Sequence, residues 1–306
     1  MYYLSLAFIS IGALSILICC LKCHKLNKKF VIFKDYKDSY IKSCFFNLVM
    51  LALFFICYIV FDVLIFFAYI PKETGFLVAC ILFSVSILIY VNTSMQAKMH
   101  LVVNKAHLET IKCLVSSVEA RDMYTKGHSE HVSNLVSLIY CNLPKAYKKK
   151  LNFTNLRTAG LLHDIGKIGV PENILNKNAA LTPLEWTYIE KHPLIGKKIL
   201  SASEHLNEIS DWIYYHHERI DGNGYYKIKD IDIPIAARII AIADTYSALV
   251  TARPYRCAME HESAITILKE ASGTQLDAYL VGIFCYIDEL KIAKCNPIEA
   301  VVEAII

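Results

Sequence analysis

Long apolar runs in the first 95 residues are the strongest constraint on how this chain can fold. They cover residues 2–21, 44–70 and 76–93, whereas the rest of the 306-residue chain has ordinary globular composition. Each run is close to or longer than the roughly 20 residues that a helix needs to cross a bilayer. The first run has no preceding basic residue and no small-residue cleavage site, which disfavours a removed signal peptide. We therefore predict that residues 1–95 form a membrane region of three helices.

Lysines are concentrated between the first two apolar runs, where residues 22–42 contain seven lysines and two aspartates. Because basic loops stay on the cytoplasmic side, we expect a multi-pass protein of the cell inner membrane, in contact with lipid. Its N-terminus would lie outside and the domain after the third helix in the cytoplasm. Free cysteines without disulfide-like spacing fit that reducing compartment. The net charge of +4 then reflects topology, and no nucleic acid polymer is expected as a partner.

Asp62 is an acidic residue within the second apolar run. A carboxylate inside a membrane is costly and is often functional. Two interpretations stay open: a sensing or ion-linked role, and a protonated group bonded to a neighbouring helix.

Residues 96–118 show helical periodicity without glycine or proline. Apolar residues recur every seven positions at Leu101, Leu108 and Val115, and Asn104, Ile111 and Val118 occupy the complementary offset. This pattern predicts a linker helix that either forms a coiled coil in a homodimer or packs as an amphipathic helix on its own domain.

From Glu119 onward, apolar residues recur every three or four positions, which predicts an all-α domain over residues 119–306. Polar residues stand inside its apolar stretches: His163 and Asp164 follow such a run, and Asp244 lies within another. Buried polar groups need partners, and imidazoles combined with carboxylates suit divalent metals. The further candidates are His128, His131, His192, His216 and His217, with Lys167 beside them to handle phosphate.

Ordered motifs over residues 119–285 resemble one family. EARDMYTKGHS at Glu119–Ser129 and LLHDIGKIGVP at Leu161–Pro171 resemble two signatures of the HD-GYP subgroup of HD-domain metal-dependent phosphohydrolases. The pattern continues in order through Lys191–Pro193, His216–Tyr226, Ile233–Ala248, Arg253–Arg256 and Gly273–Gln275. The whole chain is then expected to be all-α, with a three-helix membrane region, a linker helix and a helical HD-domain bundle.

That family hydrolyses the bacterial second messenger cyclic di-GMP, so the resemblance implies a phosphodiesterase that forms a linear dinucleotide or GMP. The apolar runs, which carry no such resemblance, add the expectation that this enzyme is anchored in the membrane. It implies a centre of iron or manganese ions, with Asp164 as the bridge and a metal-bridging hydroxide as the attacking group. Three-metal members carry an extra glutamate where this chain has Tyr124, so we expect two divalent metal ions. The implied ligands are His128, His163, Asp164, His192, His216, His217 and Asp244.

The same resemblance implies a substrate-binding site around these ligands. Lys167 follows Asp164 by three residues and would hold a phosphate oxygen or assist the leaving group, so these two are the predicted catalytic residues. Arg253 and Arg256 would grip the second phosphate. The other predicted substrate-binding residues are Asp122, Gly222, Gly224 and Tyr225, of which Tyr225 would stack on guanine.

Three features depart from the family pattern. Tyr226 replaces a proline, the segment 227–232 is short and lacks glycines, and Ser247 replaces an aspartate. Because proline restricts φ, we expect its loss to loosen or redirect the substrate loop. Two alternatives therefore stay open: a catalytically weak cyclic-dinucleotide receptor or signalling scaffold, and a hydrolase of another cyclic dinucleotide.

Overall fold

The computed structural model describes residues 11, 12, 14, 18, 49, 53, 56, 57, 59–61, 63, 64, 71–122, 127–252 and 257–297. Contacts divide the chain into two compact units, Met1–Leu108 and Glu109–Ile306. All the regular elements of the described residues are helices, and the β-type pairing found there is a single isolated bridge between Ser272 and Leu276. The all-α class expected from the periodicity is confirmed.

The longest described helix is α3, Lys72–Glu119, which contains the third apolar run and the predicted linker without a break. Among the described residues, its Glu73–Glu119 stretch is the one helix long and apolar enough to cross a membrane. The predicted spans 2–21 and 44–70, together with Asp62, fall outside the described residues apart from isolated positions. The three-helix membrane region therefore stays a prediction.

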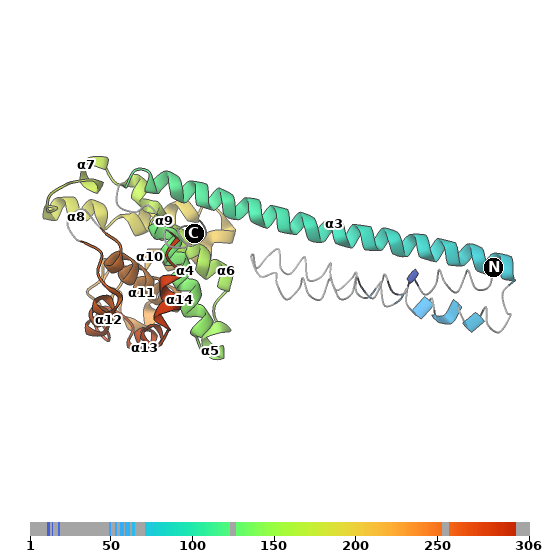
Figure 1. Cartoon of the computed structure of the whole chain (residues 1–306). Helices are drawn as coiled ribbons and strands as arrows, with labels where there is room; N and C mark the ends of the chain where they lie inside the picture. Colours follow the sequence, from blue (N-terminus) through green and yellow to red (C-terminus); the bar gives the residue numbers. More distant parts are fainter. Residues whose placement is uncertain are drawn as a thin grey trace, which may run out of the picture. The chain divides into compact units, whose positions relative to one another are not determined.

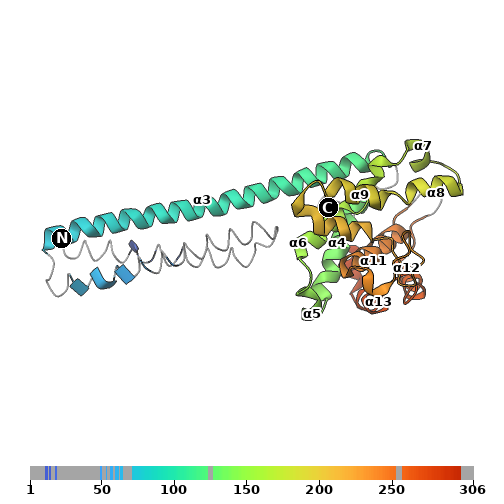
Figure 2. The ribbon, with the colours of Figure 1, turned by 180° about the vertical axis from the view of Figure 1, so that it is seen from behind.

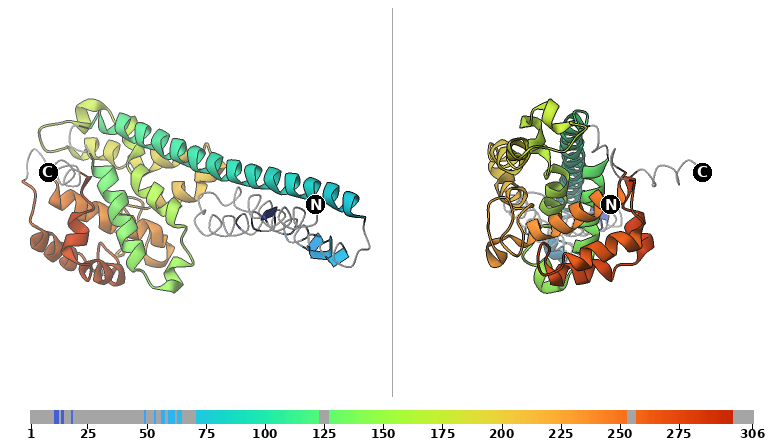
Figure 3. Two further views of the ribbon diagram at one scale, coloured as in Figure 1. Left: turned by 45° about the vertical axis from the view of Figure 1, so that its right-hand side comes forward. Right: turned by 90° about the vertical axis from the view of Figure 1, so that its left-hand side faces the viewer.

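The second unit is a bundle of helices (Figure 1). Its elements after α3 are α4 (His128–Asn142), α5 (Lys145–Lys148), α6 (Phe153–Leu162), η1 (Ile165–Gly169), α7 (Glu172–Leu175), α8 (Pro183–Ile189), α9 (His192–Leu200), η2 (Glu204–Leu206), α10 (Asn207–Tyr214), η3 (Asp230–Asp232), α11 (Ile235–Val250), α12 (His261–Glu270), α13 (Ala278–Cys285) and α14 (Glu289–Ala293). The orange and red helices α12 to α14 lie on the side of the bundle away from α7 (Figures 1, 2 and 3).

The centre of the bundle is formed by α4, α6 and α11, which pack on one another. Each contributes aliphatic side chains with no exposed surface, because its apolar residues recur on one face. These side chains are Val132, Leu135, Val136, Ile139, Leu156, Ala159, Ile239, Ile240, Ile242 and Ala243. The same three helices carry several of the candidate ligands, so the hydrophobic core positions the site directly.

The C-terminal turns of α3, from Glu109 onward, belong to the second unit. Val115 and Val118 are buried there, 8% and 6% exposed, and Lys112 Nζ lies 2.6 Å from Glu130 Oε1 on α4. The amphipathic-helix alternative therefore accounts for this end of the linker. Leu101, an earlier position of the same seam, is 57% exposed, and the coiled-coil alternative stays open for that stretch.

Two glycines allow elements of the second unit to approach closely. A Cβ atom on Gly166 would lie 1.9 Å from the carbonyl oxygen of His192, so η1 sits directly against the start of α9. A Cβ atom on Gly160 would lie 3.0 Å from the Cα atom of Ser133, so α6 sits close against α4. These approaches decide where Asp164 and His192 stand.

Candidate metal centre

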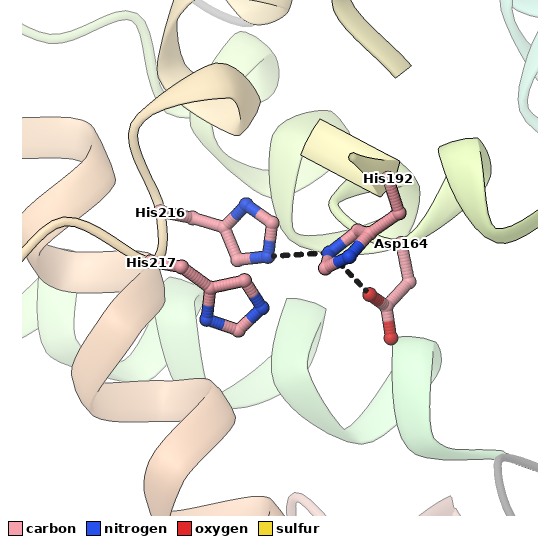
Figure 4. A group of neighbouring side chains, drawn as sticks. All are labelled: Asp164, His192, His216 and His217. Carbon is pink, nitrogen blue, oxygen red and sulfur yellow. Dashed lines mark hydrogen bonds and ion pairs between the residues drawn. The ribbon is translucent and has the colours of Figure 1, made fainter. Parts of the chain in front are cut away.

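Seven side chains with metal-binding atoms converge inside the second unit. They come from the start of α4 (His128), the junction of α6 and η1 (His163 and Asp164), the start of α9 (His192), the segment after α10 (His216 and His217) and the middle of α11 (Asp244). Figure 4 shows four of them, Asp164, His192, His216 and His217, pointing toward one another. Within this group, and within the group His128, His163 and Asp164, the potential ligand atoms lie within 4.8 Å of one another.

Asp164 belongs to both groups, and its two oxygens face different histidines. Its Oδ1 lies 3.2 Å from His192 Nε2, and its Oδ2 lies 3.4 Å from His163 Nε2. Asp244 joins from the other side, with Oδ1 3.1 Å from His128 Nε2 and 3.8 Å from His163 Nε2. A carboxylate with one oxygen toward each group is suited to bridge two cations, as expected for Asp164.

Three of the histidines are oriented by the same backbone contact. The Nδ1 atoms of His163 and His192 lie 2.9 and 2.8 Å from the carbonyl oxygens of Gly160 and Ile189, three residues earlier. His216 makes the equivalent contact with Ile213. Because a carbonyl only accepts, each Nδ1 carries a proton, so the neutral form of each ring presents its lone pair at Nε2, which is the tautomer that binds a metal.

His163 Nε2 is a buried atom with no hydrogen-bond partner among the described residues. A buried polar atom without a partner is rare and costly. His163 has no exposed surface, and the two carboxylates near this nitrogen offer no donor when ionised. A divalent cation would satisfy the nitrogen and both carboxylates together, so these residues fit the metal centre expected from the sequence.

Burial keeps two of the histidines neutral. It lowers the pKa of His216 well below the ordinary histidine value, and the neighbouring His217 adds to that effect. Burial, assisted by His192, lowers the pKa of His217 to about 3. Both imidazoles are therefore unprotonated at neutral pH, as metal ligands must be.

The carboxylates raise the pKa of His163, whereas the pKa values of His216 and His217 are lowered. Burial alone would lower its pKa, but Asp164 and then Asp244 raise the pKa of His163 to about 9. Burial alone would also raise the pKa of Asp164, yet Lys167 and His163 hold the pKa of that carboxyl well below its usual range. The excess negative charge at this point attracts a cation, either a proton on His163 or a metal ion.

Lys167 adds a fixed positive charge beside the cluster. Its Nζ atom lies 2.7 Å from Asp164 Oδ2 and 3.2 Å from Asp122 Oδ2. Although burial opposes the charge, Asp164 and Asp122 raise the pKa of Lys167 above its ordinary value. The turn that joins Asp164 to Lys167 is the 3₁₀ helix η1 rather than a continuation of α6, which ends at Leu162.

Ser247 links two histidines on the outer side of the cluster. Its hydroxyl oxygen lies 2.9 Å from His128 Nδ1 and 2.9 Å from His131 Nδ1, and the side chain is fully buried. A hydroxyl can accept one hydrogen bond while donating another. The Ser247 hydroxyl can therefore accept from the N–H of one ring and donate to the unprotonated Nδ1 of the other. His131 therefore lies behind His128 and outside both ligand groups, and burial lowers the pKa of His131 to about 4.

Tyr226, which replaces the proline, is held by contacts that proline could not make. Its backbone N–H donates to Glu218 Oε1 at 2.7 Å, and the N–H of Ile228 donates to the other carboxylate oxygen at 2.7 Å. The Tyr226 hydroxyl donates to the carbonyl of Glu190 at 3.1 Å, and its ring stacks on Tyr214 with centroids 4.4 Å apart. The loop is thus fastened at this position, contrary to the loosening expected from the sequence.

The short segment after Tyr226 shows a different consequence of its composition. Lys227 and Asp230 have φ values of 59° and 24°, in the left-handed region that favours glycine. The family glycines that this segment lacks would adopt such angles without strain. Here non-glycine residues adopt them, at a cost to be offset by the contacts of the loop.

The predicted substrate-binding residues are partly placed by the structure. Tyr225 packs against His217, with ring centroids 4.7 Å apart, and Gly224 lies so close to Glu218 that a Cβ atom would come within 2.6 Å of its Cα. Gly222 has a φ of 79° and supplies the turn before them. The positions of Tyr124, Arg253 and Arg256 lie outside the described residues.

A cavity of about 210 Å³ adjoins the metal cluster on the side of His216, His217 and Asp244. Its wall includes side chains that the sequence patterns did not single out, namely Arg219, Asn223, Thr245 and Gln275. All four lie inside motif blocks recognised in the sequence, so membership of a block was a usable signal for them. Their proximity to each other depends on tertiary contacts between distant segments.

Known proteins resemble the second unit. A family model described as the HD domain matches residues 114–280, a range that contains all the motif blocks identified in the sequence, and the family resemblance is thereby confirmed. The chain is 37% identical over 185 residues to a protein of Vibrio cholerae serotype O1 named "Probable cyclic di-GMP phosphodiesterase", covering 56% of this chain and 42% of the relative.

Two further relatives bear different names. The chain is 36% identical to the "3'3'-cGAMP-specific phosphodiesterase 3" of Vibrio cholerae serotype O1, over 59% of this chain and 39% of the relative. It is 35% identical to a "Cyclic di-GMP phosphodiesterase" of Thermotoga maritima, over 59% of this chain and 49% of the relative. The chain spans less than half the length of these three curated relatives.

Proposed function

Because the chain belongs to the HD-domain family, we propose that it is a metal-dependent phosphodiesterase that hydrolyses cyclic di-GMP to a linear dinucleotide or GMP. The observation that carries the proposal is the cluster of potential ligands, in which two groups share Asp164, and Asp244 Oδ1 lies 3.1 Å from His128 Nε2. Within this cluster, His163 Nε2 has no hydrogen-bond partner among the described residues. Relatives named as cyclic di-GMP phosphodiesterases support this choice of substrate.

We assign to the cluster two divalent ions, iron or manganese, held by His128, His163, Asp164, His192, His216, His217 and Asp244. Such a pair supplies Lewis-acid stabilisation of a phosphodiester and lowers the pKa of bound water. Asp164 would orient both ions, since its two oxygens face different histidines.

Lys167 provides the charge that a phosphodiester needs next to this centre. Its ammonium group stands 2.7 Å from Asp164 and is aimed by Asp122 at 3.2 Å. Placed there, Nζ would donate a hydrogen bond to a phosphate oxygen or to the leaving oxygen as negative charge develops. Asp122 acts through Lys167, whereas Arg253 and Arg256 keep their proposed role at the second phosphate.

We further propose that residues 1–95 anchor the domain in the cytoplasmic membrane. The length and apolar character of α3 support an anchor, and the lysine-rich segment 22–42 supports a cytoplasmic location for the domain. Three spans, an external N-terminus and a dimer formed through residues 96–118 belong to the same proposal.

A second substrate is favoured by one specific observation. A relative with 36% identity is named for 3'3'-cGAMP rather than cyclic di-GMP. Hydrolysis of another cyclic dinucleotide at the same centre is therefore the alternative to be tested alongside, and a nucleotide receptor without turnover is the outcome if none is hydrolysed.

The full-length chain, purified in detergent and loaded anaerobically with iron or manganese, tests the proposal. Cyclic di-GMP should be converted to a linear product at a rate that depends on bound metal. The His163→Ala/Asp164→Ala double variant should lose both metal and hydrolysis. A wild-type chain that binds two metal ions but converts no cyclic dinucleotide would refute the enzymatic proposal, and nucleotide binding by that chain would identify a receptor.

A further inference from the structure

The cavity beside the metal cluster has the size and position of a subsite for one base. Its volume of about 210 Å³ is below the roughly 300–1,000 Å³ of pockets that enclose a whole drug-sized ligand, so one ring system fits rather than an entire dinucleotide. His216 and His217 belong to both this cavity and the metal cluster, and Asp244, which also lines the cavity, lies 3.1 Å from His128 of that cluster. A phosphate held at the cluster would therefore carry its base into the cavity.

One wall of the cavity is aromatic. Tyr225 lines it and packs on His217, with ring centroids 4.7 Å apart and an angle of 43° between the rings. Nucleobases stack favourably on such side chains whatever their sequence identity. This wall explains binding of a base but does not distinguish one purine from another.

Two polar side chains of the cavity lining, Arg219 and Gln275, are held in fixed orientations. Asp221 grips Arg219 with both oxygens, at 3.0 Å from Nε and 2.6 Å from Nη2, which immobilises the guanidinium. The remaining Nη1 atom donates to Gln275 Oε1 at 3.1 Å. Since a guanidinium has only donors, the Gln275 amide must turn its oxygen toward Arg219 and its NH₂ group away.

Backbone contacts keep Gln275 in this place. The N–H of Asp221 donates to the carbonyl of Thr274 at 2.9 Å, and the N–H of Ile220 donates to the carbonyl of Gln275 at 3.4 Å. The Gln275 NH₂ group makes no hydrogen bond to the described residues, so its donors are available to a ligand in the cavity. Thr245 supplies the opposite polarity, because its hydroxyl donates to Ala241 at 2.7 Å and leaves only lone pairs.

We propose that this cavity binds one purine base of the cyclic dinucleotide and that Gln275, oriented by Arg219, selects guanine over adenine. Guanine presents the O6 and N7 acceptors on one edge, whereas adenine presents a donor, its amino group, where guanine has O6. The NH₂ group of Gln275, which cannot rotate away, would donate a hydrogen bond to guanine O6. With adenine it would face the amino group, and two donors cannot bond to each other. The inference rests on the proposed phosphodiesterase function and names the substrate feature that the site reads.

The test compares three cyclic dinucleotides on the full-length, metal-loaded chain. The values of kcat/KM are measured for cyclic di-GMP, 3'3'-cGAMP and cyclic di-AMP, with equilibrium binding of each nucleotide measured in parallel. The wild-type chain should prefer cyclic di-GMP over cyclic di-AMP. The Gln275→Glu variant presents acceptors in place of donors, and its cyclic di-GMP to cyclic di-AMP ratio should fall about 10- to 100-fold.

Two further variants separate selectivity from general damage. Gln96→Glu makes the same change at the other glutamine of the chain, exposed on α3, and should leave the ratio as in wild type. Arg219→Met frees the Gln275 amide to rotate, so the ratio should move toward one without reversing. If Gln275→Glu slows turnover of all three nucleotides by a common factor, the ratio is unchanged and the turnover result contradicts the assigned role of Gln275.

The outcomes are distinguishable from failure of the proposed function. If the wild-type chain hydrolyses none of the three nucleotides, the phosphodiesterase proposal fails, and the binding ratios still test the subsite. An unchanged ratio in Gln275→Glu, for both turnover and binding, overturns the role of Gln275. Absence of nucleotide binding to the wild-type chain overturns the subsite itself.

Discussion

The metal cluster and the loop that follows it, Gly222–Asp232, lie side by side but are held by different kinds of contact. In the cluster, ligand rings are oriented by carbonyl groups three residues earlier on the same segment, as at His163 and His192. In the loop, the carboxylate of Glu218 accepts two backbone N–H groups from residues eight and ten positions later. The first arrangement depends on particular side chains, and the second tolerates many side chains because it uses the backbone.

This difference explains why two of the three departures from the family pattern, Tyr226 and the segment 227–232, lie in the loop. A backbone N–H is available from every residue except proline, so Tyr226 can be fastened to Glu218 where proline could not. A ligand position offers no such freedom, because only a few side chains present a lone pair at the required place. Side-chain replacement is therefore expected to have large effects in the cluster and small effects in the loop.

The largest expected effect is that of Asp164→Asn. The amide keeps the shape but removes the charge that faces both ligand groups, so hydrolysis should fall at least about 100-fold through lost charge stabilisation. Metal content and turnover of the full-length chain are the measurements. The same change at the exposed Asp232, in the loop, serves as the matched control and should leave both near wild type. Retention of two metal ions by Asp164→Asn would contradict the expectation that the cluster, unlike the loop, depends on particular side chains.

The pH dependence of metal binding should distinguish two histidines of the cluster, His163 and His217. The pKa of His163 is raised to about 9, so without metal it is protonated at pH 7, and a metal ion must displace that proton. Apparent metal affinity should therefore rise about tenfold per pH unit from 7 toward 9 and then level off. In the metal-free chain the same proton stabilises the fold below pH 6.5, and this contribution is lost as the pH rises through about 9.

Equilibrium dialysis of iron or manganese across this pH range measures the affinity, and unfolding of the metal-free chain measures the stability. His217, with a pKa of about 3, adds no pH dependence to the metal affinity between pH 5 and 9. It does lower the stability of the metal-free chain as the pH falls below 6.5, because the unfolded chain then binds a proton that the folded chain does not. A flat affinity profile between pH 7 and 9 would contradict the assignment of the proton to His163.

Ser247→Ala tests a contact behind the ligands. Removing the hydroxyl leaves the Nδ1 atoms of His128 and His131 without their shared partner, so metal affinity should fall about 10- to 100-fold, as is usual for groups that orient a ligand. Metal titration with the full-length chain checks this. Ser117→Ala, an exposed serine on α3, is the control. An unchanged affinity would mean that Asp244 alone orients His128.

Substitutions at Tyr226 should have moderate effects, confined to the loop. Tyr226→Pro removes the N–H bonded to buried Glu218 and should lower the free energy of unfolding by about 1–3 kcal/mol. Tyr226→Phe removes only the hydroxyl bonded to Glu190, for about 0.5–1.5 kcal/mol. Denaturant unfolding and turnover are measured for both, with metal content expected to stay constant. A large gain in turnover for Tyr226→Pro would show instead that this loop limits catalysis.

The smallest expected effect is that of Lys227→Gly. Relief of the left-handed backbone at Lys227 should stabilise the chain, but the added flexibility of glycine when unfolded opposes it, so the net gain stays below about 1 kcal/mol. Lys229→Gly is the matched control, because Lys229 has a φ of −109° and gains nothing from glycine. Equal destabilisation by both changes would contradict the assigned strain.

The sequence alone determined the helical class of the domain and predicted its candidate metal-binding side chains. Apolar residues at intervals of three and four specify helices, and His163, Asp164 and Asp244 stand out because a polar group in an apolar run needs a partner. The order of the motif blocks resembled that of the HD-domain family, and this resemblance identified the family. The membrane region rests on composition alone, because two of its three predicted spans lie outside the described residues.

Only the tertiary structure decided what each side chain does toward its neighbours. The hydrogen bond from Tyr226 to Glu218, the position of Ser247 between His128 and His131, and the orientation of the Gln275 amide by Arg219 join residues through folded geometry. A residue type states which groups can donate or accept, but its partner is selected by the packing of helices far apart in the sequence. For this reason the candidate ligand set could be predicted from the sequence, whereas the loop contacts and the cavity proposed to select a base could not.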